Sequence, residues 1–147
     1  MAAAVMATDP HLIISAARGW IGTPYRHQAS RRGAGCDCLG LLRGVWRELH
    51  GAEPEAVPPY AADWDLREGE SLRDGLARHL RAVPPAAMRG GDVALFRLTA
   101  RGPARHCGII GENDGRFTLI HARQNGRVRE EPLAPFWQSR LAFLFRT

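Results

Sequence analysis

The sequence predicts an α+β fold in which N-terminal helices pack on an antiparallel sheet of about five strands. Two observations support this class. Apolar residues recur at helical spacing in the first half of the chain, and after the Gly-Gly pair at residues 90–91 they follow the pattern of strands. Sequences typical of hairpin turns, at residues 113–115 and 124–126, then separate short strands. Because no repeat or linker divides the 147 residues, we expect one domain spanning residues 1–147.

The first helix should begin after Asp9, because Asp is a favoured N-cap and Pro10 suits the first helical position. Apolar residues continue at helical spacing as far as Trp20 and Ile21, so we expect Gly22 to end this helix. A polar loop with several Arg and Gly residues follows.

Two further helices are expected before the strands. One starts near Asp37, carries an apolar stripe and ends at Gly51. Residues 52–64 contain three prolines and should be irregular. A weaker helix is expected over residues 71–83, where the Pro-Pro pair at 84–85 stops it. The strands are then expected at residues 92–96, 105–111, 116–122, 127–131 and 141–146.

Charge and hydropathy limit the classes of function. The net charge is +5, and all twenty basic residues are Arg. These residues are spread along the chain and form no basic helix or arm, so we expect no nucleic-acid binding. No segment has the apolar length of a membrane-spanning helix, so we expect no membrane insertion.

The cysteines and the N-terminus indicate where the protein is made. Cys36, Cys38 and Cys107 are an odd number, and the first two are too close to bridge without strain. We therefore expect free thiols and folding in a reducing compartment. The N-terminal stretch is apolar but lacks the positive region and the length of a signal peptide. We expect synthesis in the cytoplasm without a signal peptide.

Cys38 is the candidate nucleophile. It directly follows Asp37 at the start of an amphipathic helix, where unpaired backbone N–H groups and the helix dipole favour a thiolate. The same N–H groups can stabilise an oxyanion. A free cysteine can equally be a small buried core residue, so its position alone leaves both interpretations open.

His106 and His121 are the candidate base and its orienting partner. They lie on two predicted strands joined by the turn at residues 113–115, so they should face each other directly or diagonally across that hairpin. A thiolate, an imidazole base and a third group that orients the base form the arrangement of a thiol hydrolase. A single strand histidine is more often structural, but two paired histidines downstream of a helix-start cysteine favour catalysis.

Five short motifs, in order along nearly the whole chain, resemble those of NlpC/P60 cysteine peptidases. Residues 35–41 (Gly-Cys-Asp-Cys-Leu-Gly-Leu) resemble the Asp-Cys-Ser-Gly-Leu nucleophile motif of that family, and residues 22–25 resemble its upstream tyrosine segment. Residues 91–96 are similar to the Gly-Asp strand that precedes the histidine of the family. Residues 106–110 resemble its His-Val-Gly-Ile-Tyr motif, and residues 120–122 match its third polar position.

The segments at residues 20–28, 35–41 and 46–48 look most like a phage-type branch that includes the cell wall peptidase of gene transfer agents. The resemblance implies a papain-like fold, a Cys-His-His triad and no cofactor. It implies stem peptides of peptidoglycan as substrate, cut between D-glutamate and the diamino acid. It also implies hub proteins of a phage-like tail or baseplate as partners, so the protein would act at the cell wall as part of a particle.

The resemblance also suggests substrate contacts. In wall-recycling members of the family, a Tyr, an Asp and a Ser after the nucleophile hold the free amine of the peptide. Tyr25 and Asp37 match two of these residues. Leu39 replaces the Ser, so we expect stems still attached to glycan to be accepted as readily as free peptides. Arg26 and Gln28, in the loop before the nucleophile, are further candidates, since Arg can hold a stem carboxylate through paired hydrogen bonds.

Two surfaces are candidates for docking to a particle, residues 53–64 and residues 136–147. Aromatic residues that could act as interface anchors there are Tyr60, Trp64, Phe136 and Trp137.

Two alternative functions stay open at this stage. A metal-binding module could use Cys36, Cys38, His106, Cys107 and His121 as ligands. The spacing is poor for this purpose, because adjacent strand residues such as His106 and Cys107 should point to opposite faces. The other alternative is a non-catalytic structural component of a tail or baseplate that keeps the fold.

Overall fold

A computed structural model describes residues 8–57 and 69–147. The helical elements are α1 (Pro10–Arg18), α2 (Cys38–His50), α3 (Ser71–Ala77), the short α4 (Pro135–Gln138) and the 3-10 turn η2 (Pro85–Ala87). The strands are β1 (Ser30–Arg31), β2 (Gly35–Cys36), β3 (Arg81–Val83), β4 (Val93–Arg97), β5 (Ala104–Asn113), β6 (Arg116–Ala122), β7 (Val128–Pro132) and β8 (Leu141–Arg146). Most helical residues precede the main antiparallel strands, which confirms the predicted α+β class.

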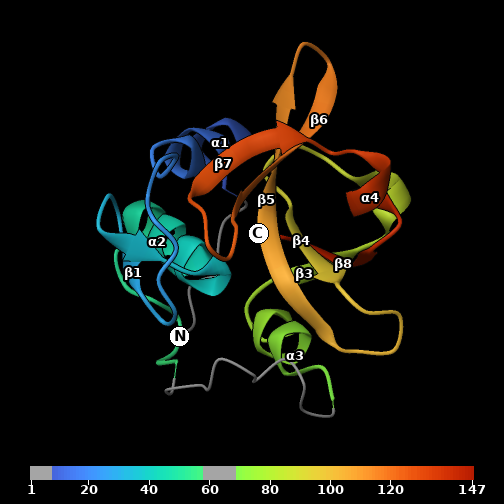
Figure 1. The fold of residues 1–147 in the computed structure, drawn as a ribbon, viewed down its shortest axis with the longest axis horizontal. Helices are drawn as coiled ribbons and strands as arrows, with labels where there is room; N and C mark the ends of the chain where they lie inside the picture. Colours follow the sequence, from blue (N-terminus) through green and yellow to red (C-terminus); the bar gives the residue numbers. More distant parts are fainter. Residues whose placement is uncertain (1–7, 58–68) are drawn as a thin grey trace.

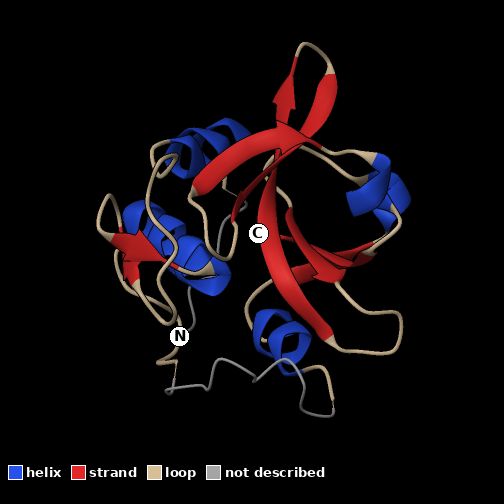
Figure 2. Cartoon of the chain, viewed as in Figure 1, coloured by secondary structure: helices blue, strands red, loops and turns tan. Residues whose placement is uncertain are grey.

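The helices and the sheet form two sides of the molecule. Figure 1 shows α1 and α2 together on one side, a strongly curved sheet beside them, and the short α4 on the opposite side of the sheet. Figure 2 shows the same separation of helices from strands. α1 packs against α2, and both contact the long central strand β5.

The main sheet is antiparallel in the order β3-β8-β4-β5-β6-β7. β5 is its longest strand. It pairs with β4 along its first part, and with β6 from Ile109↔Ile120 to Asn113↔Arg116. The first part of β5 therefore extends beyond its pairing with β6, and this extension carries the predicted base.

Alternate side chains of β5 enter two different hydrophobic clusters. Cys107 and Ile109 face α1 and α2, together with Leu41, Leu95, Ile120 and Phe145. Ile110 faces the other way, into a cluster with Phe96, Leu119, Trp137 and Leu144. His106 lies on this second side, since its ring packs against Phe96 and Trp137. The predicted divergence of His106 and Cys107 to opposite faces is confirmed.

The first helix is shorter than predicted. α1 ends at Arg18 with Gly19 as its C-cap, and the chain turns before Gly22. The turn carries the Trp20 indole onto α2, where its N–H donates to Glu48 at 2.9 Å. Packing of a buried aromatic ring against α2 thus overrides the helical periodicity that extended the prediction to residue 22.

The helix predicted over residues 71–83 was wrong in its second half. α3 ends at Ala77, and Arg81–Val83 forms strand β3, paired with β8 at the edge of the sheet. The sheet therefore has six strands, one more than predicted. The two-residue strands β1 and β2, within the predicted polar loop, were also missed. Strands this short carry no readable alternation, and tertiary pairing decides them.

The other predicted elements are confirmed to within a few residues. Asp37 caps α2 and Gly51 ends it, as the sequence indicated. Both hairpin turns contain residues with positive φ, at Asp114 (52°), Gly115 (75°) and Asn125 (62°). The irregular stretch predicted for residues 52–64 lies partly outside the described residues.

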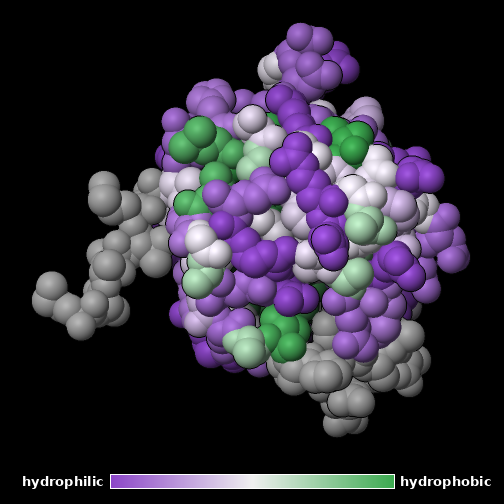
Figure 3. Space-filling view, turned by 90° about the vertical axis from the view of Figure 1, so that its left-hand side faces the viewer, coloured by the Kyte–Doolittle hydropathy of each residue, from purple (hydrophilic) through white to green (hydrophobic). Residues whose placement is uncertain are grey.

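The surface over the helices is largely hydrophilic. Figure 3 shows this face with hydrophobic residues gathered in a few separate patches. Among the described residues, no helix has the length and apolar character that crossing a membrane would require.

Candidate active site

Asp37 fixes both the start of α2 and the loop before it. Its carboxylate accepts hydrogen bonds from the backbone N–H of Gly40 at 2.7 Å and from that of Gln28 at 2.8 Å. Gly40 has no space for a side chain, because a Cβ there would lie 1.9 Å from the carbonyl oxygen of Ala29. Loop and helix are therefore in tight contact, and Cys38 is held as the first residue of α2.

Cys38 meets β5 where that strand extends beyond its pairing with β6. The thiol donates to the backbone carbonyl of Arg105, with 3.7 Å between sulfur and oxygen. His106 and Cys107 follow on the same strand, and both side chains are close enough to the Cys38 thiol to change its acidity. The structure thus brings the predicted nucleophile and the predicted base together. Cys38 is nearly buried, with 9% of the residue exposed.

His106 and His121 form a directly bonded pair. The distance between Nε2 of His106 and Nδ1 of His121 is 2.7 Å, and the rings are inclined at 77°. Since Ile109 faces Ile120, the two histidines lie diagonally across the β5–β6 hairpin, as predicted from its turn. His121 is completely buried, whereas His106 is partly exposed.

Glu131 and Trp137 support this pair from behind. The carboxylate of Glu131 lies 3.1 Å from Nε2 of His121 and accepts from Trp137 Nε1 at 2.8 Å and from Arg129 Nε at 2.6 Å. The Trp137 ring stacks on His106 with centroids 5.2 Å apart, and meets His121 edge-on at 5.0 Å. We call His106, His121, Glu131 and Trp137 the histidine wall.

The three cysteines differ in acidity. A hydrogen bond from Cys107 lowers the pKa of Cys38. Burial opposes this effect, and the hydrogen bond and charge of His106 lower the pKa further. The bond to Cys38 and burial both raise the pKa of Cys107 well above its ordinary value. Burial raises the pKa of Cys36 to about 12. Only Cys38 has the acidity of a reactive thiol.

His121 and Glu131 are held in opposite charge states. Burial lowers the pKa of His121 to about 4, the charge of His106 adds to this effect, and the bond to Glu131 opposes it. Burial disfavours the charged form of Glu131, but hydrogen bonds from Trp137, His121 and Arg129 outweigh burial and lower its pKa to about 2. At neutral pH, His121 is therefore neutral and Glu131 is a carboxylate.

Tyr25 is close to the nucleophile. Burial raises the pKa of its phenol well above the usual range, and the negative charges of Cys38 and Asp37 add to that increase. Tyr25 is half-buried. Asp37, also predicted to contact substrate, is 2% exposed and engaged by backbone N–H groups. Its role as a substrate contact stays a prediction.

The other two predicted substrate residues lie on the exposed loop before α2. The aliphatic part of the Arg26 side chain covers Gly35, where a Cβ would lie 2.4 Å from Cδ of Arg26. Gln28 has a positive φ of 63°, and its amide nitrogen lies 3.2 Å from the ring of His27. Both side chains are exposed and belong to the loop that Asp37 ties down.

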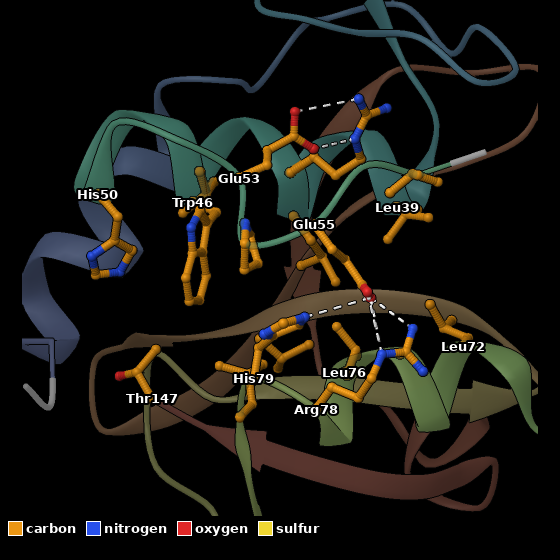
Figure 4. A pocket seen from close by; sticks show the side chains of 18 of the residues that line it. Leu39, Trp46, His50, Glu53, Glu55, Leu72, Leu76, Arg78, His79 and Thr147 are labelled. Carbon is orange, nitrogen blue, oxygen red and sulfur yellow. Dashed lines mark hydrogen bonds and ion pairs between the residues drawn. The ribbon is translucent and has the colours of Figure 1, made fainter. Parts of the chain in front are cut away.

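A cavity of about 510 Å³ lies between α2, residues 53–57 and α3 (Figure 4). Its walls are mainly apolar and include Leu39, Leu42, Trp46, Leu49, Leu72 and Leu76. An ion pair of 2.7 Å between Glu55 and Arg78 connects residues 53–57 to the end of α3. Leu39, the residue directly after Cys38, thus lines this cavity, whereas Cys38 and the histidine pair do not.

The metal-binding alternative gains no support from the described residues. Within residues 8–57 and 69–147, no group of three or more His, Cys, Asp or Glu residues is arranged to hold a metal ion. His106 and Cys107 lie on opposite faces of the sheet.

Comparison with solved structures identifies the fold as that of NlpC/P60 proteins. The NlpC/p60 domain of the peptidoglycan hydrolase SagA superposes with a TM-score of 0.65 at 18% identity, over 95% of this chain and 100% of that domain. An NlpC/P60 family protein from Bacillus cereus ATCC 10987 gives a TM-score of 0.67 at 21% identity, over 97% of this chain and 41% of that protein.

A curated relative is the gamma-DL-glutamyl hydrolase of Bacillus subtilis strain 168. It is 28% identical over 145 residues, which cover 98% of this chain and 31% of the relative. The chain thus spans about a third of the length of this relative. No protein-family model matches the chain.

Glu131 and Trp137 were missed at the sequence level. For Glu131 a signal existed, because the turn at residues 124–126 sets His121 opposite Arg129, which places Glu131 diagonally behind His121. His106 and His121 are related by the same kind of diagonal position across their own hairpin. Trp137 carries no comparable signal, since it reaches the site from the short helix α4.

Proposed function

We propose that the protein is a cysteine peptidase, a thiol hydrolase that cleaves peptide bonds in the stem peptides of peptidoglycan. The observation that carries this proposal is the placement of the Cys38 thiol. It lies at the start of α2 within hydrogen-bonding reach of His106, which is itself bonded to His121 at 2.7 Å. Cys38 is the nucleophile, His106 the general base and acid, and His121 the residue that orients His106.

The reaction follows from these positions. The Cys38 thiolate attacks the carbonyl carbon, and the backbone N–H groups at the start of α2 stabilise the oxyanion. Protonated His106 then donates its proton to the leaving amine, which leaves an acyl group on Cys38. Water, deprotonated by His106, attacks this thioester, and the acid is released as the thiol re-forms.

The proposed substrate class rests on the relatives and on the loop before α2. The Bacillus subtilis relative is named for glutamyl hydrolysis, and SagA is a peptidoglycan hydrolase. We assign the scissile bond to the one between D-glutamate and the diamino acid of the stem. Exposed Arg26 is available for a stem carboxylate, Tyr25 lies near Cys38, and Gln28 belongs to the same exposed loop as Arg26.

Leu39 shapes the second part of this proposal. Leucine has no hydroxyl that could help fix a free amine, and Leu39 instead lines an apolar cavity. Stem peptides attached to glycan should then be cleaved as readily as free peptides.

The test is incubation of the protein with intact sacculi and with isolated stem peptides, followed by mass spectrometry of the products. We expect fragments from both, with cleavage after D-glutamate. The Cys38→Ala variant is the control for contaminating hydrolases. Cleavage of free peptides alone would contradict the argument from Leu39. No cleavage of either substrate would favour the alternative of a non-catalytic structural component.

We further propose that the enzyme acts at the cell wall as part of a phage-like particle, docked on hub proteins of a tail or baseplate. The sequence resemblance supports this, together with the exposed ring of Phe136, which is 52% exposed and lies 3.7 Å from the guanidinium of Arg140. Trp137, predicted as an anchor beside it, is buried in the histidine wall and cannot serve. Tyr60 and Trp64 lie outside the described residues.

The docking proposal is tested by copurification with particles. Phe136→Ala should reduce the amount of enzyme bound, whereas Leu12→Ala should not, because Leu12 is similarly exposed but lies on α1. Equal binding of both variants, or a wild-type chain that never copurifies with particles, would contradict the docking surface.

A further inference from the structure

Glu131 is the residue on which the contacts of the histidine wall converge. Its two carboxylate oxygens meet three nitrogens: Nε2 of His121 at 3.1 Å, Nε1 of Trp137 at 2.8 Å and Nε of Arg129 at 2.6 Å. Glu131 lies behind His121, on the side away from His106, and takes no direct part in the reaction proposed above.

We propose that Glu131 is a positioning residue that fixes on which ring nitrogen His121 and then His106 carry their protons. The catalytic consequence rests on the function proposed above, whereas the proton positions follow from the contacts together with the charge states of Glu131 and His121.

The first step concerns His121. A carboxylate can only accept hydrogen bonds, and Glu131 is ionised at neutral pH because its hydrogen bonds lower its pKa to about 2. Its contact with Nε2 of His121 therefore requires the proton of His121 to be on Nε2. His121 is neutral and carries one ring proton, so its Nδ1 must be an acceptor.

The second step concerns His106. The short contact of 2.7 Å joins Nδ1 of His121 to Nε2 of His106. Since Nδ1 of His121 can only accept, Nε2 of His106 must donate. In neutral His106 the other nitrogen, Nδ1, is then the basic one and takes up the thiol proton. Glu131 thus sets the tautomer of the proposed base through an intervening ring.

The remaining contacts hold the Glu131 carboxylate in place. The Trp137 indole donates to one carboxylate oxygen of Glu131 while its ring stacks on His106. Trp137 therefore contacts the first and the last residue of the hydrogen-bonded series Glu131–His121–His106. Arg129 donates to the other oxygen from the same strand. The carboxylate therefore has little freedom to rotate away from His121.

The direct test measures the wild-type protein. Long-range ¹H–¹⁵N NMR of the histidine rings at neutral pH distinguishes a protonated from a bare ring nitrogen. We expect His121 with its proton on Nε2 and a bare Nδ1. A proton on Nδ1 of His121 would overturn the proposal, and this measurement needs neither a variant nor a substrate.

The variant test replaces the charge and keeps the shape. In Glu131→Gln, one carboxylate oxygen becomes an amide nitrogen, which must face either the indole N–H or His121. We expect a second His121 tautomer, and a kcat lowered by about 10- to 100-fold with little change in KM. Unchanged tautomer and kcat would overturn the proposal. Glu131→Asp keeps the charge and should retain the Nε2–H tautomer of His121. This variant provides a second test if Glu131→Gln folds poorly.

The matched control is Glu130→Gln on the same strand. Glu130 also accepts several hydrogen bonds, from Arg18 at 2.8 Å and Thr118 at 2.7 Å, but it does not contact the histidine wall. This variant should lower stability without changing either histidine tautomer or kcat. If the wild-type chain hydrolyses no substrate, the proposed function fails, while the NMR result still decides the role of Glu131.

Discussion

The two parts of the candidate site are held in place by different means. The start of α2 is fixed by bonds that are local in sequence, since Asp37 reaches Gly40 three positions away and Gln28 nine positions away. The histidine wall is assembled from two strands, β6 and β7, the open part of β5, and a short helix, with His106 and His121 fifteen positions apart. Cys38 meets this wall through β5 alone.

The two parts of the site therefore control different properties. The helix start controls where the thiol lies, through tightly packed backbone and the hydrogen bonds that the Asp37 carboxylate accepts. The wall controls the protonation of the proposed base, and it contains a buried neutral His121 beside the ionised Glu131. Changes in the first part should act on geometry, and changes in the second should act on proton positions and on pH dependence.

The largest effect is expected from removing the thiol. Cys38→Ala should lower hydrolysis of stem peptides by about 10⁴-fold or more, because the acyl intermediate cannot form. Iodoacetamide near neutral pH should label Cys38 before Cys107 and Cys36, whose pKa values are raised. Mass spectrometry of the labelled protein checks this order. Preferential labelling of Cys107 would contradict the assignment of Cys38, at the start of α2, as the nucleophile.

The next largest effect concerns the orienting residue of the wall. His121→Ala should lower kcat by about 10³-fold, because His106 loses the acceptor that fixes its tautomer. His121→Asn or His121→Gln should keep more activity, since both side chains can still accept a hydrogen bond. Steady-state kinetics on stem peptides separates the variants. Wild-type turnover by His121→Ala would assign the orienting role to another residue.

The same contrast explains what the sequence could predict. Local signals placed Asp37 as a cap, Cys38 at the helix start and the histidine pair across one hairpin. The helix predicted over residues 71–83 includes edge strand β3, because Leu76 and Leu80 continue a helical spacing that pairing with β8 overrides. Trp137 could not be placed, because its contact with His106 depends on how the chain after β7 folds back.

A smaller effect should appear in the pH dependence of stability. His121 has a pKa of about 4 in the folded protein against 6.5 in the unfolded chain, so the unfolded chain binds more protons between these values. Stability should fall as pH drops from 6.5 to 4, by about 3 kcal/mol at most. Glu131, with a pKa of about 2, adds a further loss as pH falls from 4.5 to 2.

The measurement is urea denaturation of the wild type and of His121→Asn at several pH values between 7 and 4. The Asn variant cannot take up this proton, so its stability should depend less on pH over this range. Parallel curves for the two proteins would show that His121 is not held neutral by the fold.

The smallest expected effect tests the helix start without touching the wall. Gly40→Ala should lower the free energy of unfolding by about 1–3 kcal/mol, because the new Cβ would lie 1.9 Å from a backbone oxygen that cannot move alone. Gly75→Ala is the matched control in α3, where the nearest atom is in a flexible Arg78 side chain at 3.5 Å, so this variant should gain up to about 1 kcal/mol. Urea denaturation gives both values.

In Gly40→Ala the histidine tautomers should remain those of the wild type, because no bond of the wall passes through the loop that shifts. If the tautomers changed as well, the two parts of the site would be mechanically coupled, and the contrast between them would not hold.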